Sequence, residues 1–132
     1  MNAGVLFGIA VGGACGAVSR YGVSSLAVRL GEGWAWGTFV VNVLGCAAIG
    51  ALLALMLTPE GAPRWAASPA MRAAVLVGFV GSFTTFSTYA WEAVEMVRAG
   101  QVWRAGAYLV VSNALGLAAV WGGWKVFERV GG

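Results

Sequence analysis

The sequence predicts an all-α membrane protein, with four transmembrane helices in a single transmembrane domain that covers residues 1–132. Of its residues, 60% are hydrophobic and 10% are charged, whereas soluble domains carry about a quarter charged residues. A soluble domain of this length would leave about a third of its chain surface exposed, and this sequence has too little polar material to cover it. The 7 Trp and 21 Gly agree, because both residue types are common in membrane-spanning helices.

Four apolar segments lie between polar breaks and give the expected helices. Their ranges are about 3–30, 37–57, 71–96 and 104–127. The breaks are Gly31–Gly33, Thr58-Pro59 with the polar loop at 60–69, and a short turn at 98–101. Most tryptophans fall near segment ends, where an aromatic belt at the membrane interface would place them.

The first segment carries glycines at intervals of four residues, at Gly4, Gly8, Gly12 and Gly16. Such a stripe of small residues lets two helix backbones approach closely, as helix association in lipid requires. We expect an interface there, within one chain or between two, unless the stripe only reflects the glycine content of the chain.

Loop charges give little preference for one orientation in the membrane. One side carries Arg64, Arg72, Lys125 and Arg129, and the other carries Arg29, Arg98 and Arg104, with Arg20 as a further candidate. Orientation is normally set by a clear excess of Lys and Arg on one side. We therefore expect the chain to insert both ways round, which would allow a dual-topology antiparallel homodimer. The alternative is a single topology, in which one arginine outweighs the others.

The sequence lacks the residues of common enzyme sites, and we expect no enzyme. It has no His and no Asp, so neither a Ser-His-Asp triad nor an ordinary zinc site can form. No basic tract indicates nucleic acid as a partner. The informative residues are polar ones inside apolar segments, because each is costly in lipid and marks a pathway or a partner.

Several of these polar residues can donate hydrogen bonds without carrying charge. Thr38 and Asn42 share one face of the second segment, and Tyr108 and Ser112 share one face of the fourth. The Asn42 amide suits an anion that must be bound and released, but it could equally form a hydrogen bond that only joins helices. Arg20 either extends to the interface or lies in an aqueous vestibule that attracts anions.

The third segment holds the strongest signal, because residues 78–89 combine glycines with a run of Ser and Thr. We expect the third helix to be broken mid-membrane, where unwound backbone exposes carbonyls and amides. The alternative is an intact helix in which each hydroxyl bonds a carbonyl one turn earlier. Beyond the break, Thr85, Thr88 and Glu92 share a polar face, and Phe86 and Tyr89 share an adjacent one. Aromatic edges carry positive potential and can stabilise a small anion without trapping it.

Residues 12–21, 37–45 and 81–88 read GGACGAVSRY, GTFVVNVLG and GSFTTFST. In these stretches the sequence resembles the Fluc (CrcB) family of fluoride ion channels, and the resemblance extends over nearly the whole chain. The family usually has a second Phe where this chain has Tyr89, and some members have Ser in place of Gly116.

The resemblance implies a fluoride-selective channel in the inner (cytoplasmic) membrane, a multi-pass protein that exports fluoride and relieves its toxicity. It also implies an antiparallel homodimer with two pores and a structural sodium ion at the dimer centre. By position, the sodium ligands would be the backbone carbonyls of Gly81 and Thr84. The pore residues would be Asn42, Phe86, Tyr89, Ser87, Thr88, Tyr108, Ser112, Thr38 and Glu92, with Arg20 near the vestibule.

Two other functions share some of these features. A small dual-topology, proton-coupled multidrug exporter would have the same length and charge balance, but it needs a carboxylate within the membrane, usually in its first helix. The first segment has none, and Glu92 is the only deep acid. A non-transporting assembly subunit is the third possibility, and it would leave the Thr and Asn faces without a purpose.

Overall fold

The computed structural model describes residues 2–31, 34–57 and 68–128. These residues form four helical spans that are long and apolar enough to cross a membrane, which confirms the predicted number of transmembrane helices. The spans are Ala3–Leu30, Trp36–Met56, Pro69–Arg98 and Val102–Glu128. The expected loop up to residue 67, with Arg64, and the C-terminal Arg129 lie outside the described residues.

The first and third spans are made of several consecutive elements. The elements in chain order are α1 (Ala3–Ala27), the 3₁₀-helix η1 (Val28–Leu30), α2 (Trp36–Met56), α3 (Pro69–Arg72), the π-helix η2 (Ala73–Val80), α4 (Gly81–Phe83), α5 (Phe86–Arg98) and α6 (Val102–Glu128).

Short polar residues and glycine fix the helix ends. The Asn2 side chain accepts the Gly4 N–H at 2.9 Å and begins α1, because the first N–H groups of a helix have no partner within it. Ser68 caps α3 in the same way, with proline following at the first helical position. Gly100 turns the chain between α5 and α6 with φ 75°, a conformation that glycine adopts without strain.

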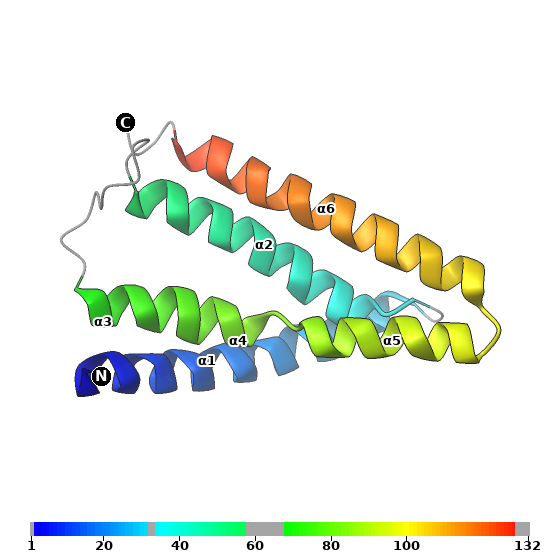
Figure 1. Ribbon diagram of the computed structural model, residues 1–132, viewed down its shortest axis with the longest axis horizontal. Helices are drawn as coiled ribbons and strands as arrows, with labels where there is room; N and C mark the ends of the chain where they lie inside the picture. Colours follow the sequence, from blue (N-terminus) through cyan, green and yellow to red (C-terminus); the bar gives the residue numbers. More distant parts are fainter. Residues whose placement is uncertain (1, 32–33, 58–67, 129–132) are drawn as a thin grey trace.

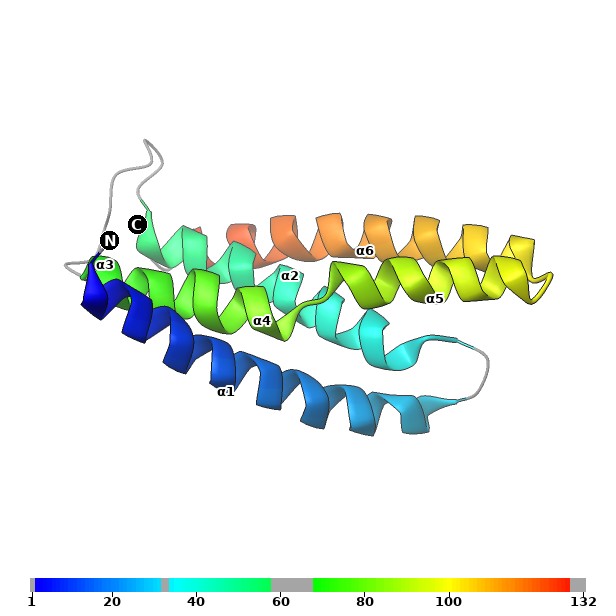
Figure 2. The ribbon, with the colours of Figure 1, turned by 60° about the horizontal axis from the view of Figure 1, so that its bottom comes forward.

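The helices pack as two parallel pairs, α1 with the α3–η2–α4 segment and α2 with α6, and the two pairs run in opposite directions (Figures 1 and 2). Glycines allow the α2–α6 pair to approach closely. A Cβ atom added at Gly50 would meet the Val120 carbonyl oxygen, and one added at Gly123 would meet the Ala47 carbonyl oxygen. Larger residues at either position would push the two helices apart.

The glycine stripe of α1 is an interface within the chain. Gly8, Gly12 and Gly16 lie against the carbonyl oxygens of Ala70, Ala74 and Phe79. The step from 74 to 79 is one residue longer than the matching step on α1, and it falls within the π-helix, whose wider turn takes up an extra residue. The π-helix therefore keeps the third span in register with the glycines.

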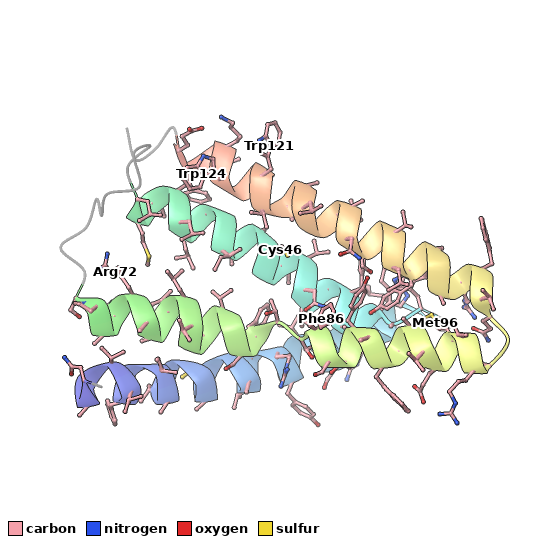
Figure 3. All side chains as sticks on the ribbon, viewed as in Figure 1. Cys46, Arg72, Phe86, Met96, Trp121 and Trp124 are labelled. Carbon is pink, nitrogen blue, oxygen red and sulfur yellow. The ribbon has the colours of Figure 1, made fainter. Side chains whose placement is uncertain are left out.

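Two tryptophans near the C-terminal end of α6 lie at one end of the bundle. Trp121 and Trp124 lie near the end where α3 begins, on the same side of the molecule as Arg72 (Figure 3). Phe86 lies far from this end, at the junction between α4 and α5 (Figure 3). The junction therefore occupies the interior of the third span, with helical segments on both sides of it.

Candidate functional site

The chain leaves the helical conformation at Thr84 and Thr85. Thr84 has φ −88° and ψ 163°, and Thr85 has φ −149° and ψ 115°. Asn42 of α2 bridges this interruption with both ends of its amide. Its Nδ2 donates to the Thr85 carbonyl at 3.0 Å, and its Oδ1 accepts the Thr85 N–H at 2.8 Å. One side chain thus satisfies the backbone donor and acceptor of an extended residue, as a neighbouring strand would.

The same interruption changes the partners of two carbonyls. In a continuous helix the Thr85 N–H would bond the Gly81 carbonyl, and the Thr88 N–H would bond the Thr84 carbonyl. Here Thr85 donates to Asn42 instead, and Thr88 donates to the Thr85 hydroxyl, which caps α5, at 3.3 Å. The carbonyls of Gly81 and Thr84 are therefore released from their usual helical donors.

Glu92 is held by hydroxyl groups from two other spans. The Thr38 hydroxyl of α2 donates to Oε1 at 2.7 Å, and the Tyr108 hydroxyl of α6 donates to Oε2 at 2.8 Å. Thr38 and Tyr108 are themselves buried. A carboxylate is costly in a membrane span unless it is hydrogen-bonded or solvated, and these two bonds also fix α5 against α2 and α6.

Aromatic rings continue from the interruption toward this carboxylate. The rings of Phe86 and Tyr89 are 5.9 Å apart and those of Tyr89 and Tyr108 are 5.2 Å apart. Trp34 meets Tyr108 edge-on, at 5.4 Å and 87°. Phe86 is 80% exposed on the single chain, whereas Tyr89 is 8% exposed. The three aromatic residues predicted for the pore are neighbours, but one chain alone encloses only Tyr89 and Tyr108.

Two cavities meet at the interruption. The first, here called the Asn42 cavity, has a volume of about 440 Å³ and is lined by Asn42, Thr85, Phe86, Tyr89, Ser112 and Asn113, among others. The second, the Arg20 cavity, has a volume of about 370 Å³ and is lined by Arg20, Thr38, Thr85 and Thr88, among others. Thr85 belongs to both. Nine of the twelve predicted site residues line one of these two cavities. Ser87, which is exposed, Glu92 and Tyr108 line neither.

Some polar atoms in this region have capacity for a further bond. The buried Ser112 hydroxyl has no partner among the described residues, and neither has the buried indole N–H of Trp34. Within residues 2–31, 34–57 and 68–128, no group of three or more His, Cys, Asp or Glu side chains could hold a metal ion.

Sequence reasoning gave too little weight to Thr85 and Asn113. Thr85 joins the two cavities and caps α5, and a Thr before a new helix is a recognisable N-cap signal. Asn113 donates from Nδ2 to the Tyr89 hydroxyl at 2.6 Å and to the Leu109 carbonyl at 2.7 Å. Its position four residues after Leu109 is compatible with that backbone bond, but no sequence pattern indicates the contact with Tyr89.

These features define a small helical membrane protein that holds hydrogen-bonded polar groups within its spans. The chain belongs to the CrcB-like (camphor resistance) family, whose model matches residues 7–124. It is 40% identical over 125 residues to the fluoride-specific ion channel FluC of Rhizobium etli, covering 94% of this chain and 96% of that protein. It is 43% identical over 123 residues to the protein of the same name from Acidobacterium capsulatum, with 92% and 94% covered.

A third relative, the fluoride-specific ion channel FluC of Solibacter usitatus, is 44% identical over 122 residues, with 92% of this chain and 96% of that protein covered. The family predicted from the three sequence stretches is thereby confirmed. The expectation that the chain is not an enzyme is confirmed as well, because the relatives are named as channels.

Proposed function

We propose that this chain is a subunit of a fluoride-selective ion channel. The observation that carries the proposal is the pair of cavities that share Thr85 in their linings and that place uncharged donors and the aromatic side chains of Phe86 and Tyr89 among apolar residues. Relatives that align with nearly the whole chain are named fluoride-specific ion channels, which supports fluoride as the ion. Arg20, which carries a positive charge, lines the Arg20 cavity but does not line the Asn42 cavity.

The chemistry of fluoride fits such a lining. The ion is small and strongly hydrated, so a pore must replace its water with several donors. A fixed positive charge deep in the path would hold the ion too long, whereas amide and hydroxyl donors bind it and release it. The unpartnered Ser112 hydroxyl and the second N–H of Asn42 offer such donors beside the ring edges of Phe86 and Tyr89.

Proteoliposomes test the proposal directly. Vesicles loaded with equal concentrations of fluoride and chloride are diluted into an impermeant anion, and a potassium ionophore is added to relieve the membrane potential. Vesicles with the protein should release fluoride rapidly once the ionophore is present and retain chloride, while protein-free vesicles retain both. Equal release of the two anions, or no release of either, would refute a fluoride-selective channel.

We infer that two chains assemble as an antiparallel homodimer with one pore on each side. Phe86, 80% exposed on one chain, would then be enclosed at the subunit interface, and the balance of loop charges read from the sequence agrees with insertion in both directions. Two lysines added between residues 60 and 69 should force a single orientation and abolish flux. Co-expression with an oppositely biased variant should restore it, and normal flux from the first variant alone would contradict the antiparallel arrangement.

A structural sodium ion at the dimer centre is part of the same proposal. The carbonyls of Gly81 and Thr84 fit the role, because oxygen atoms suit a hard cation and both have lost their helical donors. The ion would neutralise the carbonyl dipoles at the interruption and join the two third spans. A structural ion predicts fluoride flux that is independent of a sodium gradient, and uphill fluoride transport driven by sodium would contradict it.

Export of fluoride across the inner membrane, with relief of its toxicity, is the cellular role that we propose. Cells that lack the endogenous channel should grow in fluoride when they express this chain, and lack of rescue by membrane-inserted protein would count against that role. A proton-coupled multidrug exporter would use Glu92 as its coupling acid, yet Glu92 is tied by two hydroxyls. Cationic drug uptake driven by a proton gradient would instead favour the exporter.

A further inference from the structure

A closed set of three hydrogen bonds holds the Tyr89 hydroxyl. The hydroxyl donates to the Leu109 carbonyl at 3.3 Å, and Asn113 Nδ2 donates to the Tyr89 oxygen at 2.6 Å and to the same carbonyl at 2.7 Å. A carbonyl oxygen only accepts, so the Asn113 atom beside it must be the amide nitrogen, and the orientation of the amide is fixed. Both the proton and a lone pair of the phenol are thereby in use.

Of the two contacts to the phenol, the one from Asn113 is the stronger. An O–H donor and its acceptor are normally about 2.7–2.8 Å apart, so the 3.3 Å bond to Leu109 is long. The amide contact at 2.6 Å is short. Without Asn113 the hydroxyl would keep only the long bond, and its proton would be free to turn toward the Asn42 cavity, which Tyr89 and Asn113 both line.

A free phenol in that position would change how an anion is bound. Hydrogen bonds between O–H groups and anions are short and roughly twice as strong as bonds between neutral groups. A fluoride ion bonded by the Tyr89 hydroxyl would be retained, whereas the ring edge attracts it only weakly. With the hydroxyl bound by Asn113 and Leu109, Tyr89 offers an anion what phenylalanine would offer, an aromatic edge without an available proton.

We propose that Asn113 is a positioning residue, which binds the Tyr89 hydroxyl and so keeps this tyrosine acting through its ring edge in the anion path. This inference rests on the proposed channel function. The same contact explains why position 89 can be a tyrosine. Its hydroxyl is tolerated because the Asn113 amide, one helical turn beyond Leu109, binds it.

The test compares Asn113→Leu in two backgrounds, the natural chain and Tyr89→Phe. Leucine keeps the approximate size of asparagine and removes its donors. Fluoride efflux from proteoliposomes should fall by about fivefold or more in the natural background, the factor that corresponds to one lost hydrogen bond. In the Tyr89→Phe background the same change should leave efflux within about twofold, because no hydroxyl remains to be held. Val110→Leu, on the exposed face of α6, serves as the control for altered packing.

A second measurement reports the bond without depending on transport. The chain has 3 tyrosines, so a sample labelled with carbon-13 at the phenol carbon gives few NMR resonances, and Tyr89→Phe assigns the one of interest. Asn113→Leu should shift that resonance and leave those of Tyr21 and Tyr108 in place. Size-exclusion elution like that of the natural protein must accompany each flux measurement.

The outcomes separate this inference from the proposed function. If the natural protein releases no fluoride, the channel function fails, and the positioning role fails with it. If the natural protein releases fluoride but Asn113→Leu lowers efflux equally in both backgrounds, or in neither, the channel stands and the role of Asn113 is refuted. An unchanged Tyr89 resonance in the Asn113→Leu protein refutes it as well.

Discussion

Replacing Asn42 with alanine should destabilise the protein by removing both hydrogen bonds that bridge the interruption of the third span. The Thr85 N–H and carbonyl would each lose a partner, now at 2.8 and 3.0 Å. A buried polar group left without a partner costs about 1–3 kcal/mol. Because both groups are only part-buried, we use the lower half of that range and expect a loss of about 2–4 kcal/mol in the free energy of unfolding.

Reversible unfolding in mixed micelles measures this loss, with circular dichroism as the probe of helix content. Leu44→Ala is the matched control, because it truncates a side chain of similar size on the same helix, where Leu44 is 49% exposed. The alanine at position 42 should lower the midpoint denaturant concentration clearly, and the control should change it much less. Equal midpoints for Asn42→Ala and the natural protein would refute the bridging role.

An aspartate at position 42 separates the two bonds. It retains an acceptor for the Thr85 N–H but replaces the donor to the Thr85 carbonyl with a carboxylate oxygen, which repels that carbonyl. We expect its destabilisation to equal or exceed that of alanine. Loss of fluoride flux in Asn42→Asp therefore shows a pore role only if the variant still elutes as the assembled protein.

Three further changes test other parts of the site and the fold. Glu92→Gln leaves one oxygen to accept the two hydroxyls of Thr38 and Tyr108, so the free energy of unfolding should fall by about 1.5–3 kcal/mol. The control Glu95→Gln, at an exposed position, should have no effect. Equal denaturant midpoints for Glu92→Gln and the natural protein would contradict this prediction. Gly12→Leu places a side chain against the Ala74 carbonyl and should prevent folding. The control Gly22→Leu should fold, because a Cβ atom added at Gly22 would have nothing within 4 Å. Similar yields of folded protein for the two variants would refute the close packing at Gly12. Phe86→Ile removes an aromatic edge and should reduce fluoride efflux without altering elution, and efflux at the natural rate would remove Phe86 from the pore.

The number and limits of the spans were predictable because lipid imposes a simple rule on sequence. Backbone groups exposed to lipid must be bonded within their own helix, so most of each span must be a long apolar run with polar residues at its ends. The run from Gly37 to Leu57 corresponds to α2, which covers Trp36–Met56. The Gly and Ser/Thr composition between residues 78 and 89 also indicated where helix is weakest, and the chain is extended at Thr84 and Thr85.

The partners of the polar side chains could not be predicted in the same way. Helical spacing says which residues share a face, but it gives no distance between residues on different helices. The bonds of Glu92 to Thr38 and Tyr108 depend on how α2, α5 and α6 are rotated and shifted against one another. The π-helix at Ala73–Val80 is a further case, because it follows from the register between α1 and the third span and its own residues are ordinary helix formers.

Asn42 shows how the structure limits what a pore residue can offer. From the sequence, its amide could either join helices or bind an anion. In the fold, Oδ1 and one N–H are used to join α2 to Thr85, so a single N–H is left for an ion. With the Ser112 hydroxyl, that gives fewer donors than fluoride needs to replace its water. The ring edges of Phe86 and Tyr89, and in the proposed dimer the matching groups of a second chain, would have to supply the rest. A channel built this way depends on its assembly to hold the ion, which is why flux and elution must be measured together.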